Sequence, residues 1–86
     1  MTEEAFIRLD RRQRLEAVRA HGEHLGSRRH VGHSVHLYRV GPDRGAGFFC
    51  EVWIRLGWNQ VEWIEVARNP HVLSEYVDLK PLRLQG

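Results

Sequence analysis

The sequence is poor in cysteine, in proline and in long apolar runs, and each shortage excludes a class of protein. Cys50 is the single cysteine, so an internal disulfide is excluded. Because Cys50 stands inside an apolar run, we expect its thiol to pack as a small hydrophobic group. The longest apolar runs are two or three residues, far shorter than a bilayer-spanning helix. The acidic start MTEEAFIRLD lacks the apolar core of a secretory signal, and we therefore expect a cytoplasmic protein.

What the chain does contain is an ordinary globular composition with a basic surplus. Its 86 residues are 42% hydrophobic and 28% charged, which suits one folded domain with a small core. The formal net charge is +2, and only one of the 13 basic residues, Lys80, is a lysine. An arginine surplus suits bidentate binding of phosphates or carboxylates, although codon composition alone also produces it.

Capping signals predict that residues 2–21 are helical, in two segments. Asp10 stands three residues before Gln13, which is the spacing of a capping box. The longer helix is therefore predicted over 11–21. Gly22 is predicted to end it in the left-handed conformation.

After this helix the hydrophobic pattern changes to alternation, which predicts a four-stranded antiparallel meander over residues 23–67. The predicted strands are 23–29, 33–40, 48–55 and 60–67. Asn69 and Pro70 then open a short C-terminal helix, predicted over 69–78, and residues 79–86 form a tail. The predicted fold class is α+β in the order ααββββα, a single domain with helices on one face of the sheet.

Turn preferences lead to a hypothesis for the strand register. Three-residue hairpin loops favour a third residue that accepts left-handed backbone, and Gly32 and Asn59 stand at these positions. Joining the two hairpins so that one face is continuously apolar completes the register. The predicted pairs are Leu25 with Leu37, Leu37 with Cys50, Val35 with Val52, Val52 with Ile64, and Cys50 with Val66.

This register predicts an outer face that carries four aromatic side chains: Tyr38, Phe49, Trp53 and Trp63. Trp53 lies opposite Trp63, and Tyr38 opposite Phe49. A face that met only water would seldom carry four aromatic residues. We expect a protein–protein interaction domain, a homodimer through this face or a complex with another protein. The alternatives are aromatic pairs that only stabilise the sheet, and a small-molecule site.

The same outer face is predicted to carry a polar row across three strands, formed by His36, Glu51 and Glu65. Two adjacent carboxylates repel each other, and a protonated His36 would relieve the repulsion. We interpret the row first as a structural ion-pair cluster. A divalent metal site and an acid–base pair are the alternatives. We predict no resident metal and no cofactor.

Five of the six histidines fall within HGEHLGSRRHVGHSVH, residues 21–36. On a helix, the spacing of His30, His33 and His36 would align three zinc ligands. The intervening Val-Gly pair disfavours a helix, and on a strand His33 and His36 point to opposite faces. Solvated surface histidines are the simplest interpretation. The alternative is a pH response in which acid loosens an interface.

A second candidate surface is the basic segment over residues 8–30, where seven arginines stand against three acidic residues. The candidate phosphate-binding residues are Arg11, Arg12, Arg19 and Arg28. A basic helix beside aromatic side chains is a pattern that binds RNA. Because Glu51 and Glu65 on the predicted face would repel phosphates, nucleic-acid binding is the alternative and not the first prediction.

No catalytic motif is recognisable, and we do not expect an enzyme. The glycines of GPDRGAG, residues 41–47, precede a predicted strand instead of a helix, so they lack phosphate-cradling geometry. Ser27, Ser34 and Ser74 stand outside any nucleophile-elbow sequence. Residues 11–21 carry too little apolar surface for an amphipathic membrane helix, so no membrane contact is expected.

Two short stretches carry a resemblance to a family. They are Gly22-Glu-His-Leu25, at the start of the first strand, and Phe48-Phe-Cys-Glu-Val-Trp53, an aromatic strand with Cys50 where the pattern has an aliphatic residue. In these the chain resembles small bacterial single-domain proteins, over most of residues 2–78. The resemblance implies an α+β fold and carries no activity, cofactor or catalytic residue.

Overall fold

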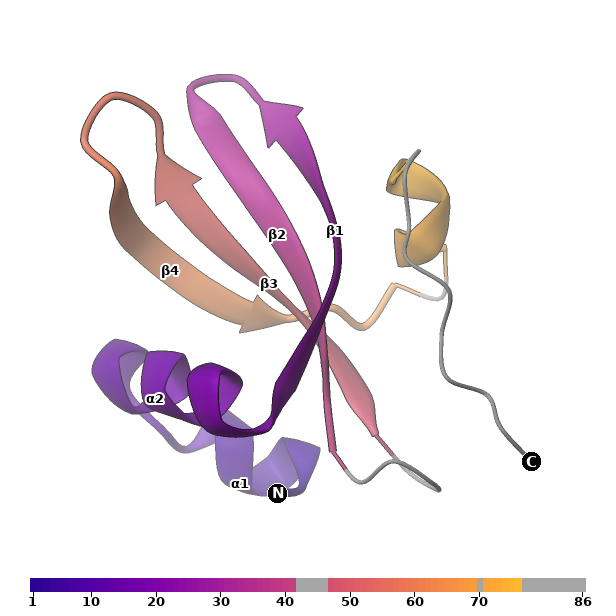
Figure 1. Cartoon of the computed structure of the whole chain (residues 1–86). Helices are drawn as coiled ribbons and strands as arrows, with labels where there is room; N and C mark the ends of the chain where they lie inside the picture. Colours follow the sequence, from indigo (N-terminus) through magenta and orange to yellow (C-terminus); the bar gives the residue numbers. More distant parts are fainter. Residues whose placement is uncertain (42–46, 70, 77–86) are drawn as a thin grey trace.

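The computed structural model has an α+β fold in which two helices precede a four-stranded antiparallel sheet and a short 3-10 turn (Figure 1). The structure describes residues 1–41, 47–69 and 71–76. Its elements are α1 (Glu3–Ile7), α2 (Arg11–His21), β1 (Gly22–His30), β2 (His33–Val40), β3 (Phe48–Arg55), β4 (Gln60–Val66) and η1 (Val72–Glu75). The strands follow one another in the order β1-β2-β3-β4, the predicted meander. Each predicted strand is confirmed to within one residue at either end.

The start of α2 is the predicted capping box. The Asp10 side chain accepts a hydrogen bond from the Gln13 N–H at 2.8 Å, and the Gln13 side chain accepts one from the Asp10 N–H at 3.1 Å. The predicted left-handed stop at Gly22 is wrong, because its φ of −87° and ψ of 145° are extended and lead directly into β1. Glycine is needed here for space, since a Cβ would lie 2.5 Å from the Val18 carbonyl oxygen.

The β1–β2 hairpin is one residue tighter than predicted. Its turn is Val31-Gly32 alone, with Gly32 at a φ of 80°, because strand pairing continues to the residues on either side. A bulge in β1 then leaves Leu25 as the extra residue, so that Gly26 lies opposite Leu37. The predicted pair of Leu25 with Leu37 is therefore wrong.

The β3–β4 hairpin keeps the predicted pairing away from its turn. Its turn has left-handed backbone at Asn59, with a φ of 53°, as predicted, and also at Gly57, with a φ of 88°. The confirmed pairs are Val52 with Ile64, Cys50 with Val66, and Trp53 with Trp63.

The predicted pairing between the two hairpins is wrong by one residue. Leu37 pairs with Glu51, and Tyr38 pairs with Cys50. The prediction assumed that only one face of the sheet is buried, whereas both faces are covered. Strands that are buried on both sides lose the alternation from which a register is read. His36 and Tyr38 consequently share the helix side of the sheet with Cys50.

Each face of the sheet carries its own buried cluster, so the sheet is the middle of three layers. The helix-side cluster contains Phe6, Ala17, Val18, Val40, Phe48, Cys50, Val52 and Ile64. The outer cluster contains Leu25, Leu37, Val72 and Tyr76, through which η1 covers part of the outer face. Figure 1 shows the helices on one side of the sheet and η1 on the other. Burial raises the pKa of the Cys50 thiol to about 12, and the thiol packs as the predicted small hydrophobic group.

Two arginines of α2 cover the free edge of β4. Arg11 donates a hydrogen bond to the Glu62 carbonyl oxygen at 3.3 Å, and Arg14 donates one to the Ile64 carbonyl oxygen at 2.7 Å. Carbonyl groups on an exposed edge strand would otherwise be open to pairing with another chain. These side chains close the edge and also hold α2 against β4.

The C-terminal helix predicted over 69–78 is reduced to the four-residue turn η1. The predicted cap by Asn69 is not formed: the N-cap of η1 is His71, without a side-chain capping bond, and the Asn69 side chain accepts a hydrogen bond from the His71 N–H at 2.9 Å just before the turn. The turn ends at Tyr76, whose φ of −113° and ψ of 131° are extended. Residues 70, 77 and 78, and the predicted tail 79–86, lie outside the described residues. In the part of the chain that the structure describes, no helix combines the length and the apolar character needed to cross a membrane.

Candidate functional site

The four predicted interface residues are divided between the two faces of the sheet. Trp53 and Trp63 stack on the outer face, with ring centroids 4.8 Å apart and planes 20° from parallel. Phe49 shares this face and packs against the outer cluster, but Tyr38 packs against the helix-side cluster. Trp53 is 9% exposed and Trp63 39%. Other residues of the same chain therefore cover most of the surface of both indoles.

The predicted polar row is also divided. Glu51 and Glu65 pair directly across β3 and β4. His36 pairs with Val52 instead, on the helix side of the sheet. The predicted row of His36, Glu51 and Glu65 is therefore wrong, and its cause is the one-residue error in the central register.

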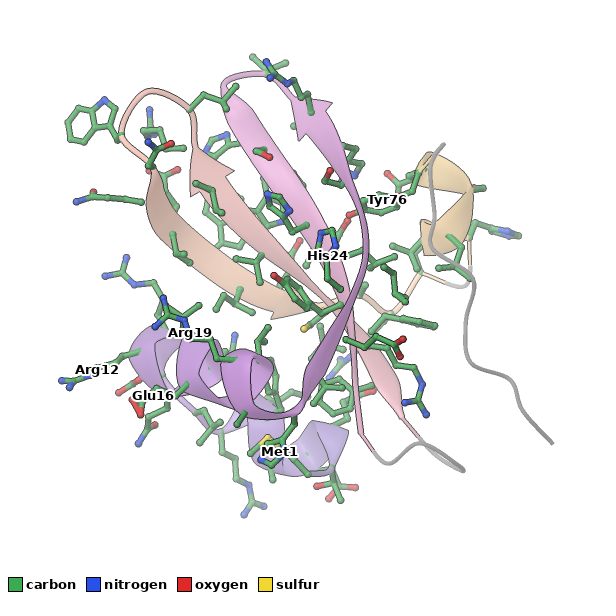
Figure 2. All side chains as sticks on the ribbon, viewed as in Figure 1. Met1, Arg12, Glu16, Arg19, His24 and Tyr76 are labelled. Atoms are coloured by element: carbon green, nitrogen blue, oxygen red, sulfur yellow. The ribbon has the colours of Figure 1, made fainter. Side chains whose placement is uncertain are left out.

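Glu51 is instead a buried carboxylate that two other side chains compensate. Arg28 donates to Glu51 Oε2 at 3.2 Å, and the Tyr76 hydroxyl donates to the same oxygen at 2.6 Å; Tyr76 reaches the sheet from the end of η1 (Figure 2). Burial alone would lower the pKa of Arg28, but hydrogen bonds with Tyr76 and Glu51 raise it above its ordinary value. Burial and the Glu51 carboxylate raise the pKa of the Tyr76 hydroxyl. Arg28 thus belongs to a structural network and is not available to a phosphate.

A second network, which no sequence pattern indicated, lies beside the two tryptophans. Glu62, the bulged residue of β4, accepts a hydrogen bond from Arg55 at 2.7 Å and contacts the His33 ring. Hydrogen bonds with Arg55 and His33 hold the pKa of the Glu62 carboxyl below its ordinary value. The His33 ring centroid lies 5.6 Å from that of Trp53 and 5.3 Å from that of Trp63. The charge of Glu62 is therefore matched by side chains of the sheet itself.

Two histidines of the histidine-rich segment, His24 and His36, form a hydrogen-bonded chain with Ser34 on the helix side of the sheet. His24 Nε2 lies 3.2 Å from His36 Nδ1, and Ser34 Oγ lies 3.0 Å from His36 Nε2. Burial lowers the pKa of His36. Among the described residues, no three or more His, Cys, Asp or Glu side chains come together in a way that could hold a metal ion.

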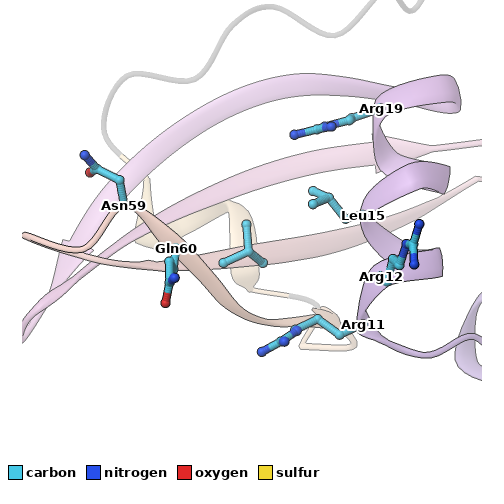
Figure 3. A pocket seen from close by; sticks show the side chains of 7 residues that line it. Arg11, Arg12, Leu15, Arg19, Asn59 and Gln60 are labelled. Carbon is cyan, nitrogen blue, oxygen red and sulfur yellow. The ribbon is translucent and has the colours of Figure 1, made fainter.

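A groove lined by arginines and amides lies between α2 and the β3–β4 hairpin (Figure 3). Its volume is about 460 Å³. Arg11, Leu15 and Arg19 follow one another at i, i+4 spacing and so share one face of α2, and Arg11 and Arg19 extend toward the hairpin in Figure 3. The lining residues are Arg11, Arg12, Leu15 and Arg19 from α2, and Asn59, Gln60 and Val61 from the hairpin.

The groove continues into a second hollow of about 420 Å³ on the helix side of the sheet. The two share Leu15, Arg19 and Val61. The rest of the second lining is mostly apolar and consists of Val18, Gly22, His24, Tyr38, Val52 and Ile54. Figure 2 shows Arg19 on α2 and His24 on the sheet at this side of the molecule. A ligand would therefore meet a cationic rim and a largely apolar floor.

Little within the groove cancels its positive charge. Arg12 lies 3.8 Å from Glu16, but these side chains are 91% and 68% exposed, so the ion pair contributes little. Arg11 donates to a backbone carbonyl, which orients its guanidinium and leaves the charge in place. The described lining residues opposite the helix, Asn59 and Gln60, are amides and carry no charge.

The β1–β2 and β3–β4 turns lie at the end of the sheet away from the helices (Figure 1), and they carry exposed apolar side chains. Val31 is 90% exposed, Trp58 71% and Leu56 37%. The Leu56 N–H donates to the Gly32 carbonyl oxygen at 2.9 Å, which holds the two hairpin turns together. This hairpin end is the one part of the described surface where three such residues lie on adjoining turns.

Of the four arginines that the sequence suggested for phosphate binding, three line one groove, whereas Arg28 lies on the outer face, where it binds Glu51. The opposite wall, Asn59 and Gln60, was not predicted, because the approach of the hairpin to α2 depends on tertiary packing. The only local signal was an adjacent pair of amides after an exposed aromatic residue. No protein-family model, curated protein or solved structure matches this chain. The function is therefore argued from the site.

Proposed function

We propose that this protein is a nucleic-acid-binding domain that holds phosphate groups in the groove between α2 and the β3–β4 hairpin. The observation that carries the proposal is the meeting of three guanidinium groups with two amides in one groove. A guanidinium binds phosphate oxygens through two parallel hydrogen bonds, and a side-chain amide both donates to and accepts from the edge of a base. This combination favours a nucleic acid over a simple anion.

The charge distribution supports the same proposal. The chain has a pI of about 9.2, and a basic groove raises the local concentration of a polyanion. Glu51 and Glu65 would repel phosphates only on the outer face, and the groove lies on the helix side. Glu51 is in addition balanced by Arg28. Repulsion between these carboxylates and phosphates, which argued against nucleic-acid binding in the sequence, therefore does not apply to the groove.

Replacement of two groove arginines tests the proposal. We expect Arg12→Ala with Arg19→Ala to weaken binding of a labelled mixed-sequence RNA and to reduce the salt slope of log K by about 1 for each arginine. Both side chains are exposed, so the free energy of unfolding should change by less than about 0.5 kcal/mol for each. Fluorescence anisotropy at several salt concentrations measures the affinity and the slope together.

The matched control is Arg8→Ala with Arg68→Ala, which removes the same charge from two exposed positions outside the groove. Equal weakening by the control pair would contradict a localised site. Failure of the natural chain to bind heparin at low salt would remove the proposal altogether. If a polyglutamate peptide bound equally tightly, the groove would recognise negative charge in general, and the proposal of nucleic-acid binding would be contradicted.

A second copy of this chain is the second candidate partner, which would make the protein a homodimeric interaction domain. The exposed apolar side chains at the hairpin end, and the 39% exposure of Trp63, favour it. Clustered exposed apolar groups of this kind are typical of protein interfaces.

Light scattering of the natural chain and of Trp63→Ala tests the homodimer. We expect twice the chain mass of 10.1 kDa for the natural chain and a single chain mass for the variant. Trp53→Ala is a poor test, because the loss of a side chain that is 9% exposed would cost about 3–5 kcal/mol of stability by itself. A natural chain of 10.1 kDa at high protein concentration would contradict the dimer.

A further inference from the structure

We propose that the nucleic acid is single-stranded, and that Trp58 at the tip of the β3–β4 hairpin stacks on an unpaired base beside the groove. This inference rests on the proposed function, because it specifies which form of nucleic acid the groove accepts. It adds a base-contacting element to a site that otherwise holds phosphates.

Trp58 is the tryptophan that the fold leaves uncovered. Trp53 and Trp63 stack on each other, and they are 9% and 39% exposed. Trp58 is 71% exposed. An indole is a large apolar group, and a free one offers a flat face on which any base can stack.

The turn holds Trp58 next to the groove wall. Its neighbours Gly57 and Asn59 have left-handed φ values of 88° and 53°, and the Asn59 N–H donates to the Arg55 carbonyl oxygen at 3.0 Å. Asn59 and Gln60, which follow Trp58 directly, line the groove. The two amide side chains that line the groove thus belong to the two residues that follow Trp58 in the chain. A strand that stacks on the indole would run from the hairpin tip along the groove, where the arginines of α2 can bind its phosphates.

This arrangement requires a base that is free of its partner. In a duplex the base faces are stacked inside the helix, and only phosphates, sugars and base edges reach the protein. An exposed indole at the end of a hairpin finds no partner there. Stacking on a single strand uses the indole fully and tolerates any sequence, because every base has a flat face.

The test uses the full-length chain and three labelled probes of equal length: a single-stranded oligouridylate, the corresponding duplex, and an abasic sugar–phosphate strand. We expect the oligouridylate to bind more tightly than the other two. Trp58→Ala should weaken oligouridylate binding roughly five- to a hundredfold, the range that one lost stacking contact produces. The salt slope should not change, because no phosphate contact is removed. Trp58→Phe should restore most of the affinity.

The control is Val31→Ala, which removes an exposed apolar side chain from the tip of the neighbouring hairpin and should leave all three affinities unchanged. Two results would overturn the stacking inference and leave the groove proposal intact: Trp58→Ala that binds oligouridylate as tightly as the natural chain does, or a duplex that binds at least as tightly as the single strand. A natural chain that binds none of the three probes at low salt would instead overturn the proposed function itself. Circular dichroism establishes that each variant is folded.

Discussion

Glu51 is 6% exposed, and a carboxylate in such a position loses several kcal/mol of hydration unless charged and hydrogen-bonding groups replace the water. Arg28 from β1 and Tyr76 after η1 supply those groups. The guanidinium of Arg28 also lies 5.3 Å from the centroid of Trp53 and 5.6 Å from that of Tyr76. One carboxylate thus ties β1, β3 and the C-terminal turn into the outer layer of the fold.

Removal of the cation from this network should be far more harmful than removal of its outer acidic neighbour. We expect Arg28→Ala to lower the free energy of unfolding by about 3–5 kcal/mol, because it leaves Glu51 buried without a cation. Glu75 contacts the same guanidinium at 3.8 Å with a side chain that is 44% exposed, so Glu75→Ala should cost less than about 1 kcal/mol. Urea unfolding at neutral pH measures both values. Similar losses for the two variants would contradict a structural role for Arg28.

Features that depend on immediate neighbours in the chain could be predicted at this scale. The Asp10–Gln13 capping box needs only two residues at the right spacing, and it is present as predicted. Cys50 is buried, as its position within an apolar run predicted. The partners of Glu51 could not be predicted, because Arg28 and Tyr76 reach it from distant segments of the chain.

At the scale of the elements, the ends of α2 and of the four strands could be predicted because caps and turns are local, whereas the C-terminal helix predicted over 69–78 is only the turn η1. The register between β2 and β3 could not be predicted. The adjacent residues Leu37 and Tyr38 pack into clusters on opposite faces, so β2 shows no apolar–polar alternation there. The bulge at Leu25 has no sequence signal of its own and shifts one part of β1 relative to the other. One wrong register was enough to misplace Tyr38 and His36.

The candidate site follows the same division. Arg11, Arg12 and Arg19 could be grouped from the sequence because they fall within one basic segment and one predicted helix. Arg28 stands on a strand, and which face it joins depends on the bulge. The amide wall required the packing of α2 against the hairpin, which Arg11 and Arg14 secure by binding the edge carbonyls of β4.

The whole molecule has two faces of different character. On the outer face, the described carboxylates Glu51 and Glu62 are paired with cationic or imidazole groups of the same face. On the helix side, the groove presents guanidinium groups opposite neutral amides. A polyanion is therefore attracted to one side of the sheet, and this asymmetry is the reason that the modest net charge of +2 is compatible with nucleic-acid binding.

The helix side also makes the stability of the whole molecule depend on pH. His36 is partly buried on this side, where its Nδ1 lies 3.2 Å from His24 Nε2. The pKa of His36 is lowered by burial. In the window between this folded-state pKa and the unfolded value of about 6.5, the unfolded chain binds more protons than the folded chain. The free energy of unfolding therefore falls as the pH decreases through this window.

We expect urea unfolding at about pH 7.5 and about pH 5.5 to show this loss of stability, and His36→Asn, which cannot titrate, to make it smaller. His71→Asn is the matched control, because His71 is exposed on the far side of the sheet and its replacement should leave the loss unchanged. Glu62 acts in a separate window: its lowered pKa contributes stability above the unfolded value of about 4.5, and this contribution disappears only as the pH falls through the folded value. An unchanged loss in His36→Asn between the two higher pH values would therefore count directly against His36, because Glu62 remains ionised throughout that range.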